Sequence, residues 1–360
     1  METTVQPYMS ILFLTLLNFS TFLHPSLSDD PFCNPEDKKT LLRFKKSFTN
    51  SQYILLSWDP ITDCCNWNHV DCGDTNRITS LRFVGYNLSG QIPPQIGNLP
   101  FLETINFDNV PGLLGPIAPS IANLTKLRYL IITRTNVSGP IPEFIGSLKK
   151  IEFINLSYNR LTGQIPKSIG YLPKLGGLRL DYNTLTGSIP ESFGDFKKED
   201  FYLYMSHNKL SGKIPLSMEK KDFTYIDLSE NRLEGDVVPL FRSKKKMELV
   251  DLSGNLLRFD LSKVEFPSSL VSLDLSENKV FGILPEQLTE LTGLKSFNVS
   301  YNKLCGKIPV GGNLQKFGES AYFHNCCLCG SPLESCLSLA KILTFGLCLI
   351  ECILSRYEPF

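Results

Sequence analysis

Four aspartates in the middle of this 360-residue chain, between residues 181 and 274, each follow a branched apolar residue directly. We predict that they point outward from neighbouring strands as one column, made of Asp181, Asp227, Asp251 and Asp274. Two carboxylates about 5 to 10 Å apart can cleave a glycosidic bond, and adjacent strands would give such spacings. A broad, solvated sheet has no water-excluding pocket to drive two carboxyl pKa values apart. We therefore expect a binding surface and no catalytic residue.

Other side chains with catalytic or metal-binding chemistry are few. Beyond the N-terminal leader the histidines are His69, His207 and His324, and no serine or cysteine lies in a context that marks an activated nucleophile. The neighbouring cysteines at 64–65 and 326–327 lack the two-residue gap of a zinc site, so we expect no metal and no cofactor. Lys plus Arg and Asp plus Glu both number 36, which argues against nucleic acid as a partner.

The elements that position these residues come from an internal repeat. Segments such as LSYNRLTGQIP and LDYNTLTGSIP recur every 23 to 25 residues, and ten units tile about residues 77 to 310. Their anchor asparagines are Asn159, Asn183, Asn208, Asn231, Asn255, Asn278 and Asn302. We predict an α/β solenoid, a right-handed leucine-rich-repeat superhelix with a parallel concave β-sheet and disulfide-capped ends.

Each unit has a simple expected structure. The L-x-L string forms a strand whose leucines, such as Leu156 and Leu180, point inward. The anchor asparagine then bonds the turn backbone, L-x-G-x-I-P makes a tight turn, and a helix-like segment returns the chain. The outward strand positions are the expected partner-binding face: Asn155, Arg179, Asp181, Tyr202, Tyr204, His207, Tyr225, Asp227, Asp251 and Asp274.

The ends of the chain have their own signatures. We interpret residues 1–28 as a signal peptide, 29–76 as an N-terminal cysteine-rich cap and 311–336 as a C-terminal cysteine cap. In the first cap, Asn34 can cap a helix that begins at Pro35, with Leu41, Leu42 and Phe48 facing the first repeat. The expected disulfides are Cys33–Cys64, Cys65–Cys72, Cys305–Cys327 and Cys329–Cys336.

Two further features concern processing and the C-terminal tail. Glycosylation sequons occur at Asn87, Asn123, Asn136, Asn155 and Asn298. The four bridges leave Cys326, Cys348 and Cys352, an odd number, so one thiol stays free or pairs between chains. The apolar tail, residues 337–360, is interrupted by Glu351 and is short for a membrane anchor.

Three strings together resemble the plant polygalacturonase-inhibiting proteins: SWDPITDCCNWNHVDC, CGKIPVGGNLQKF and YFHNCCLCGSPLESC. The resemblance covers about Asp30 to Cys336, including ten repeats and the irregular unit DLSGNLLRFDLSKVEFPSSL. It implies a secreted cell-wall protein that binds fungal endopolygalacturonases with its concave sheet in plant defence, with cell-wall pectin as a second expected partner. Cys326, where such proteins usually carry a basic residue, and the tail depart from the pattern.

An alternative remains open, because plant receptor kinases and receptor-like proteins share the G-x-I-P repeat. The chain could instead be a receptor-like or developmental protein that binds a peptide or protein ligand. Six residues, Ser355 to Phe360, follow the apolar tail in this sequence, so we expect no kinase domain.

Overall fold

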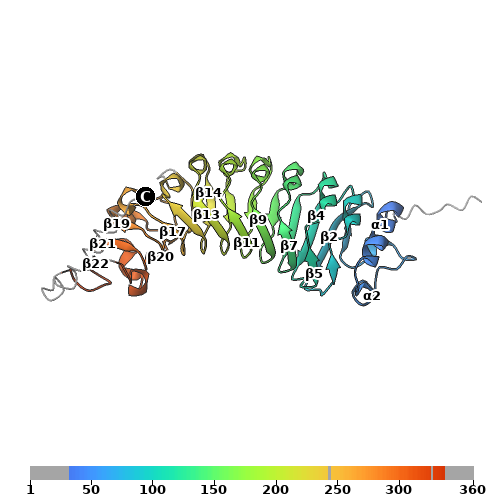
Figure 1. Ribbon diagram of the computed structural model, residues 1–360, viewed down its shortest axis with the longest axis horizontal. Coiled ribbons are helices and arrows are strands. Elements are labelled where there is room, and N and C mark those ends of the chain that lie inside the picture. The colour runs from blue at the N-terminus through green and yellow to red at the C-terminus, as the bar shows by residue number, and fades with distance from the viewer. Residues whose placement is uncertain (1–31, 242–244, 326, 337–360) are drawn as a thin grey trace, which may run out of the picture.

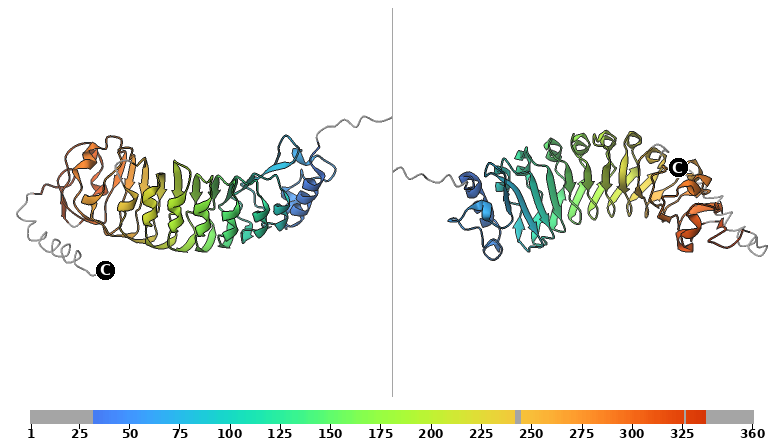
Figure 2. Two further views of the ribbon diagram at one scale, coloured as in Figure 1. Left: turned by 90° about the horizontal axis from the view of Figure 1, so that it is seen from above. Right: turned by 180° about the vertical axis from the view of Figure 1, so that it is seen from behind.

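The protein is a curved, elongated solenoid (Figure 1), and the computed structural model describes residues 32–241, 245–325 and 327–336. Figure 2 shows the same arc from above and from behind. The predicted signal peptide and tail, with Cys326, Cys348 and Cys352, lie outside the described residues. Neighbouring strands pack about 4.8 Å apart, whereas neighbouring helical turns need more space per repeat. The face of the solenoid that carries the larger sheet is therefore shorter than the opposite face, and the arc curves toward that sheet.

That concave sheet has eleven strands, of which β2 to β20 supply ten parallel ones, one for each predicted repeat. A short first strand pairs antiparallel with the second and closes the N-terminal edge. The strands are β1 (Val70–Cys72), β2 (Ile78–Val84), β4 (Thr104–Asp108), β6 (Tyr129–Thr133), β8 (Phe153–Asn155), β10 (Gly177–Arg179), β12 (Phe201–Tyr204), β14 (Phe223–Asp227), β16 (Leu249–Asp251), β18 (Ser272–Asp274) and β20 (Ser296–Asn298).

The L-x-G-x-I-P turns build a second row of strands, in which glycines such as Gly163 and Gly187 adopt φ of +74° and +78°. Eight strands form one sheet and three form another. The first set is β3 (Gly90–Gln91), β5 (Leu113–Gly115), β7 (Asn136–Pro140), β9 (Arg160–Gln164), β11 (Thr184–Gly187), β13 (Lys209–Lys213), β15 (Arg232–Gly235) and β17 (Leu256–Leu257). The second is β19 (Phe281–Gly282), β21 (Lys303–Lys307) and β22 (Cys327–Cys329).

The returning segments are 3-10 turns, which are tighter than α-helices. Most of those in the repeats directly follow a proline, and they bury an apolar side chain such as Ile169 or Phe193. In the repeats they are η2 (Pro94–Asn98), η3 (Pro119–Asn123), η4 (Glu143–Ser147), η5 (Lys167–Tyr171), η6 (Glu191–Asp195), η7 (Leu216–Lys220), η8 (Val238–Leu240), η9 (Leu261–Lys263) and η10 (Glu286–Glu290), and in the caps η1 (Cys64–Asn66), η11 (Leu314–Lys316) and η12 (Glu319–Ala321).

A ladder of asparagines joins the turns that follow the concave strands. Asn183, for example, donates through Nδ2 to the carbonyls of Leu156 and Leu180, at 2.9 and 3.1 Å. Its Oδ1 accepts from the backbone N–H of Leu161 in the preceding repeat at 2.9 Å. Each anchor thus satisfies buried backbone of its own and the neighbouring repeat, which confirms the predicted ladder.

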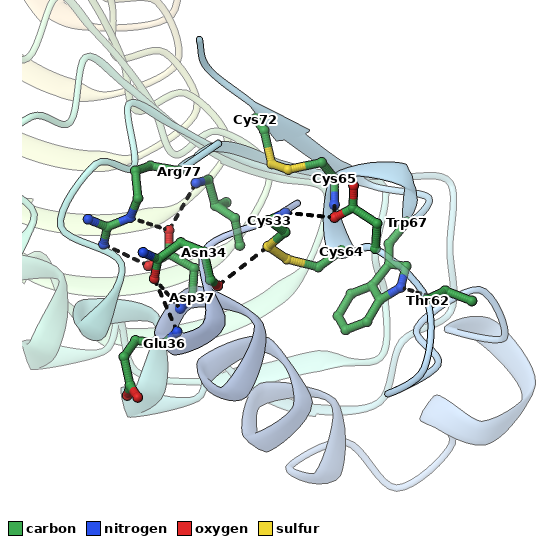
Figure 3. The surroundings of a disulfide bond; sticks show 12 residues. Cys33, Asn34, Glu36, Asp37, Thr62, Cys64, Cys65, Trp67, Cys72 and Arg77 are labelled. Atoms are coloured by element: carbon green, nitrogen blue, oxygen red, sulfur yellow. Dashed lines mark hydrogen bonds and ion pairs between the residues drawn. A yellow bond between two sulfur atoms is a disulfide. The ribbon is translucent and has the colours of Figure 1, made fainter. Parts of the chain in front are cut away.

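The N-terminal cap closes the apolar end of the first repeat (Figure 3). Asn34 accepts from the N–H groups of Glu36 and Asp37 and caps α1 (Pro35–Lys46), as predicted, and a short α2 (Ser51–Ile54) follows. Asp37 is buried and bonds Arg77 at 2.8 and 2.9 Å, which ties α1 to the first repeat. Leu41, Phe44 and Phe48 are buried. Leu42 is partly buried and packs against the same core.

Disulfides pin both caps. Cys33–Cys64 and Cys65–Cys72 lie in the first cap and Cys305–Cys327 and Cys329–Cys336 in the second, the same four pairs that the sequence suggested. In the second cap, the Tyr322 hydroxyl is buried and donates to the carbonyl of Leu314 at 2.7 Å. Within the described residues, no helix is long and apolar enough to cross a membrane.

Candidate binding face on the concave sheet

The register of the parallel strands sorts the outward residues of the concave sheet into columns. The row that we call the first column includes one residue from each of six neighbouring strands: Tyr129, Phe153, Gly177, Tyr202, Tyr225 and Leu249. The second column lies two residues further along each strand and runs through Ile131, Asn155, Arg179, Tyr204, Asp227, Asp251, Asp274 and Asn298. All ten residues expected at the partner-binding face lie on these strands or in the turns that follow them.

Three of the predicted aspartates are neighbours in the second column. Asp227, Asp251 and Asp274 lie on β14, β16 and β18 in direct register. Each carboxylate also accepts from the backbone N–H and the hydroxyl of the serine two residues later, at 3.1 and 2.7 Å for Asp227 with Ser229. One oxygen of each is therefore held by its own turn, and the column presents three half-buried, rigidly placed carboxylates.

The prediction for Asp181 was wrong. In LRLDYN the aspartate follows the second leucine of the strand motif, whereas in IDLSEN it precedes that leucine. Asp181 therefore occupies the position of Ser229, two residues beyond the second column, and is only 3% exposed. Its carboxylate forms an ion pair with Arg179, with Nε and Oδ1 3.2 Å apart. The outward group of this repeat is the Arg179 guanidinium.

The crowding of the acidic column changes the proton affinity of its middle member. Burial raises the pKa of the Asp251 carboxyl above its ordinary value, and the neighbouring Asp227 and Asp274 add to the shift. The hydrogen bonds from Ser253 act in the opposite direction. Asp251 therefore loses its negative charge at a higher pH than an isolated aspartate does.

An aromatic cluster lies beside the acidic column. The rings of Tyr202 and Tyr225 are 5.0 Å apart, and the Tyr225 hydroxyl donates to Glu248 at 3.0 Å, which raises the pKa of that tyrosine. The Arg179 guanidinium lies over the ring of Tyr204, with its Cζ 4.8 Å from the ring centroid. Burial raises the pKa of Tyr204 as well. Aromatic rings held in this way are typical anchors of protein interfaces.

His207 belongs to a different feature, a stack of rings along the turns that follow the strands. Its imidazole stacks on Tyr182 at 4.1 Å, and Tyr182 stacks on Tyr158 at 4.2 Å. The two tyrosines were missed by the sequence analysis. The signal was present, because each of the three residues directly precedes an anchor asparagine. Tyr301 does so as well, and it stacks on His324, which precedes Asn325 in the C-terminal cap.

The sequons lie in two environments. Asn87 and Asn123 are exposed and Asn136 is half-buried, with its Nδ2 donating to the carbonyl of Pro111 at 2.8 Å. Asn155 and Asn298 lie in the second column, where Oδ1 accepts from Ser157 and Ser300 as the aspartates do from their serines. A glycan on either would stand on the concave sheet.

Two groups of potential metal ligands among the described residues lie in the N-terminal cap. They are Cys33 with Cys65 and Cys72, and Cys33 with Asp63 and Cys64. The cysteine sulfurs are in disulfides, and Asp63 Oδ1 accepts from the N–H groups of Cys33 and Cys65. This donor set is therefore already used by the cap.

Comparison with known proteins gives a consistent result. Residues 34–73 match the leucine rich repeat N-terminal domain, and residues 150–172, 174–196, 201–220 and 269–291 match the leucine rich repeat. A solved plant ice-binding protein is 46% identical, with a TM-score of 0.82 over 85% of this chain and 99% of that chain.

Two curated relatives match over nearly their full length. A polygalacturonase inhibitor of Pyrus communis is 54% identical over 91% of this chain and 98% of the relative. Polygalacturonase inhibitor 1 of Arabidopsis thaliana is 54% identical over 90% of this chain and 98% of the relative. On this evidence the chain belongs to the family of plant polygalacturonase inhibitors.

Proposed function

We propose that this protein inhibits fungal endopolygalacturonases by covering the active-site cleft of the enzyme with its concave sheet. The observation that carries the proposal is the position of the Tyr202–Tyr225 pair beside the acidic column of Asp227, Asp251 and Asp274. An enzyme that handles a polyanion needs Lys and Arg around its cleft, and such a cleft complements a row of carboxylates.

The aromatic and acidic parts of the face have different roles in this proposal. The exposed parts of Tyr202 and Tyr204 supply apolar contact area at low entropic cost, because Arg179 and Tyr225 already restrict their rings. The carboxylates steer the encounter and set its orientation. Inhibition is steric, so the inhibitor needs no catalytic group of its own.

The expected setting is the plant cell wall. The predicted signal peptide, the cysteine pairs and the sequons all favour an oxidising secretory route. In this setting cell-wall pectin is a second proposed partner. We expect glycans at Asn87 and Asn123, whose exposed side chains lie outside the concave sheet, and none at Asn155 or Asn298 if this sheet contacts the enzyme.

The test is an inhibition assay of the secreted protein against a panel of fungal and bacterial endopolygalacturonases. We expect slower release of reducing ends from polygalacturonate by at least one fungal enzyme, and direct binding of that enzyme by surface plasmon resonance. A properly folded protein that binds no enzyme of the panel would favour the receptor-like or developmental alternative.

A further inference from the structure

Two consecutive glycines interrupt the outward side chains of the concave sheet. Gly176 and Gly177 stand in the string LGGL, and Gly177 pairs in register with Phe153 on β8 and Tyr202 on β12. On every other parallel strand from β2 to β20 the first-column position carries a side chain. Those residues are Ser80, Thr104, Tyr129, Phe153, Tyr202, Tyr225, Leu249, Ser272 and Ser296.

The missing side chains leave a hollow of about 520 Å³ at this point of the sheet. Aromatic rings line it on both sides, from Tyr129 and Phe153 on one and Tyr202 on the other. The Phe153 ring leans onto Gly177, where a Cβ would come within 2.8 Å of a ring carbon. Glycine at 177 is therefore what lets the ring lie flat and form one wall.

Gly176 lies on the floor of the hollow, and both of its backbone groups already have hydrogen-bond partners. Its N–H donates to the backbone carbonyl of Glu152 at 2.9 Å, and its carbonyl accepts from the backbone N–H of Tyr202 at 3.1 Å. The Glu152 carboxylate is also engaged, by Arg128 at 3.0 and 3.1 Å and by the Tyr129 hydroxyl at 3.3 Å. A polar group entering here would lose water without gaining partners on the floor, so the hollow favours an apolar occupant.

The rim, in contrast, is charged and exposed. It carries the exposed side chains of Lys174, Lys198, Glu199 and Asp200, so cations and anions balance in number. An apolar centre within a polar rim that excludes water is the arrangement in which a single buried side chain contributes most to a protein interface. The hollow is also continuous with the proposed enzyme-binding face, because Tyr202 belongs to both.

We propose that the diglycine hollow receives one protruding aromatic side chain of the polygalacturonase and determines which enzymes are inhibited. This inference rests on the proposed function and adds the chemistry of the contact. An aromatic occupant fits because Phe153 and Tyr202 can pack against its ring from two sides, edge to face or offset-stacked. Enzymes with a short or charged residue at the facing position bind less tightly.

The experiment fills the hollow from within. A Cβ at residue 176 would come no closer than 3.9 Å to another atom, and this glycine has no positive φ, so the backbone can carry a side chain there. The series Gly176→Ala, Gly176→Leu and Gly176→Phe should keep its melting temperature. The Kd for a polygalacturonase that the parent inhibits should rise with side-chain size, by at least about tenfold for Gly176→Phe, which corresponds to about 1.4 kcal/mol.

The control is Ser296→Phe, which adds a phenyl ring to the concave sheet on β20, five strands from β10 and at the first-column position next to the one equivalent to Gly176. We expect a change in Kd of less than about threefold. A folded Gly176→Phe variant that binds as tightly as the parent, or a control that weakens binding equally, overturns the hollow as a specificity site. A parent that binds no polygalacturonase overturns the proposed function and this inference with it.

Discussion

Each aspartate of the second column accepts hydrogen bonds from the turn that follows its strand and also places a negative charge on the concave surface. Asn155 and Asn298 show that an amide can replace the carboxylate, because their Oδ1 atoms accept from Ser157 and Ser300 in the same way. Charge can therefore be removed from Asp227, Asp251 and Asp274 without losing these bonds. What changes is the electrostatic field in front of the sheet.

We expect the triple variant Asp227→Asn, Asp251→Asn, Asp274→Asn to fold normally and to associate with polygalacturonase about tenfold more slowly at low ionic strength. Most of the salt dependence of the association rate should disappear, because screening acts on exposed charges over about 8 to 10 Å. Stopped-flow or surface plasmon resonance at several salt concentrations measures both effects. Lys167→Gln, on the returning turn η5, is the control. Unchanged rates and salt response in the folded triple variant would eliminate the acidic column as a binding determinant.

The raised pKa of Asp251 gives a stability prediction with a definite sign. Because the folded protein holds a proton on Asp251 more readily than the unfolded chain does, ionisation of this carboxyl destabilises the fold as pH rises through the raised pKa. Asp251→Asn removes the charge and retains the acceptor for Ser253. We expect a higher melting temperature than the parent at pH 7, and a difference that shrinks as the pH falls below the ordinary Asp pKa of about 3.9. A variant that melts below the parent at pH 7 would contradict this account.

At the scale of the repeat, the asparagine ladder connects neighbouring turns. Asn231 donates to the carbonyls of Met205, Leu228 and Ser229 at 3.0 to 3.1 Å and accepts from the N–H of Leu210 at 2.9 Å. Met205 and Leu210 belong to the preceding repeat. Removal of this one amide therefore leaves buried groups of two repeats without partners.

Asn231→Ala should lower the free energy of unfolding by at least about 2 kcal/mol, because an unpaired buried backbone group costs about 1 to 3 kcal/mol. Asn278→Ala should behave alike, since Asn278 makes the equivalent four bonds. Chemical denaturation followed by circular dichroism measures the change, with Thr186→Ala on the exposed side of β11 as the control. If either asparagine variant unfolds at the parent's denaturant concentration, the ladder does not contribute as described.

For the whole molecule, stability depends on closing the two ends of a stack in which each repeat contacts its neighbours. The described C-terminal cap has its strand β22 and both of its disulfides completed at Cys336. We therefore expect deletion of residues 337–360, which lie outside the described residues, to leave secretion, melting temperature and polygalacturonase binding unchanged or improved. Expression of the truncated chain in plant cells tests this. Loss of cell-surface retention on truncation would instead favour the receptor-like alternative.

The sequence by itself determined the repeat architecture. The spacing of Asn159, Asn183 and Asn208 fixes the unit length, the period of two in L-x-L fixes which leucines are buried, and the anchor position fixes the ladder. These features are local to one repeat and recur in the others, so each repeat independently indicates the same strand, turn and buried positions. The cap helix at Pro35 followed from equally local signals, an N-cap residue and a proline at the first helical position.

Only the tertiary structure decided which outward residues meet. Alignment of LRLDYN with IDLSEN already places Asp181 two positions beyond the acidic column, but its burial and its ion pair with Arg179 appear only in the structure. The stack of Tyr158, Tyr182 and His207, the raised pKa of Asp251 and the hollow at Gly176–Gly177 all depend on neighbours about 23 to 25 residues away in the sequence. The periodic pattern sets the scaffold, but contacts between non-identical side chains depend on inter-strand register, which is established only when the repeats stack.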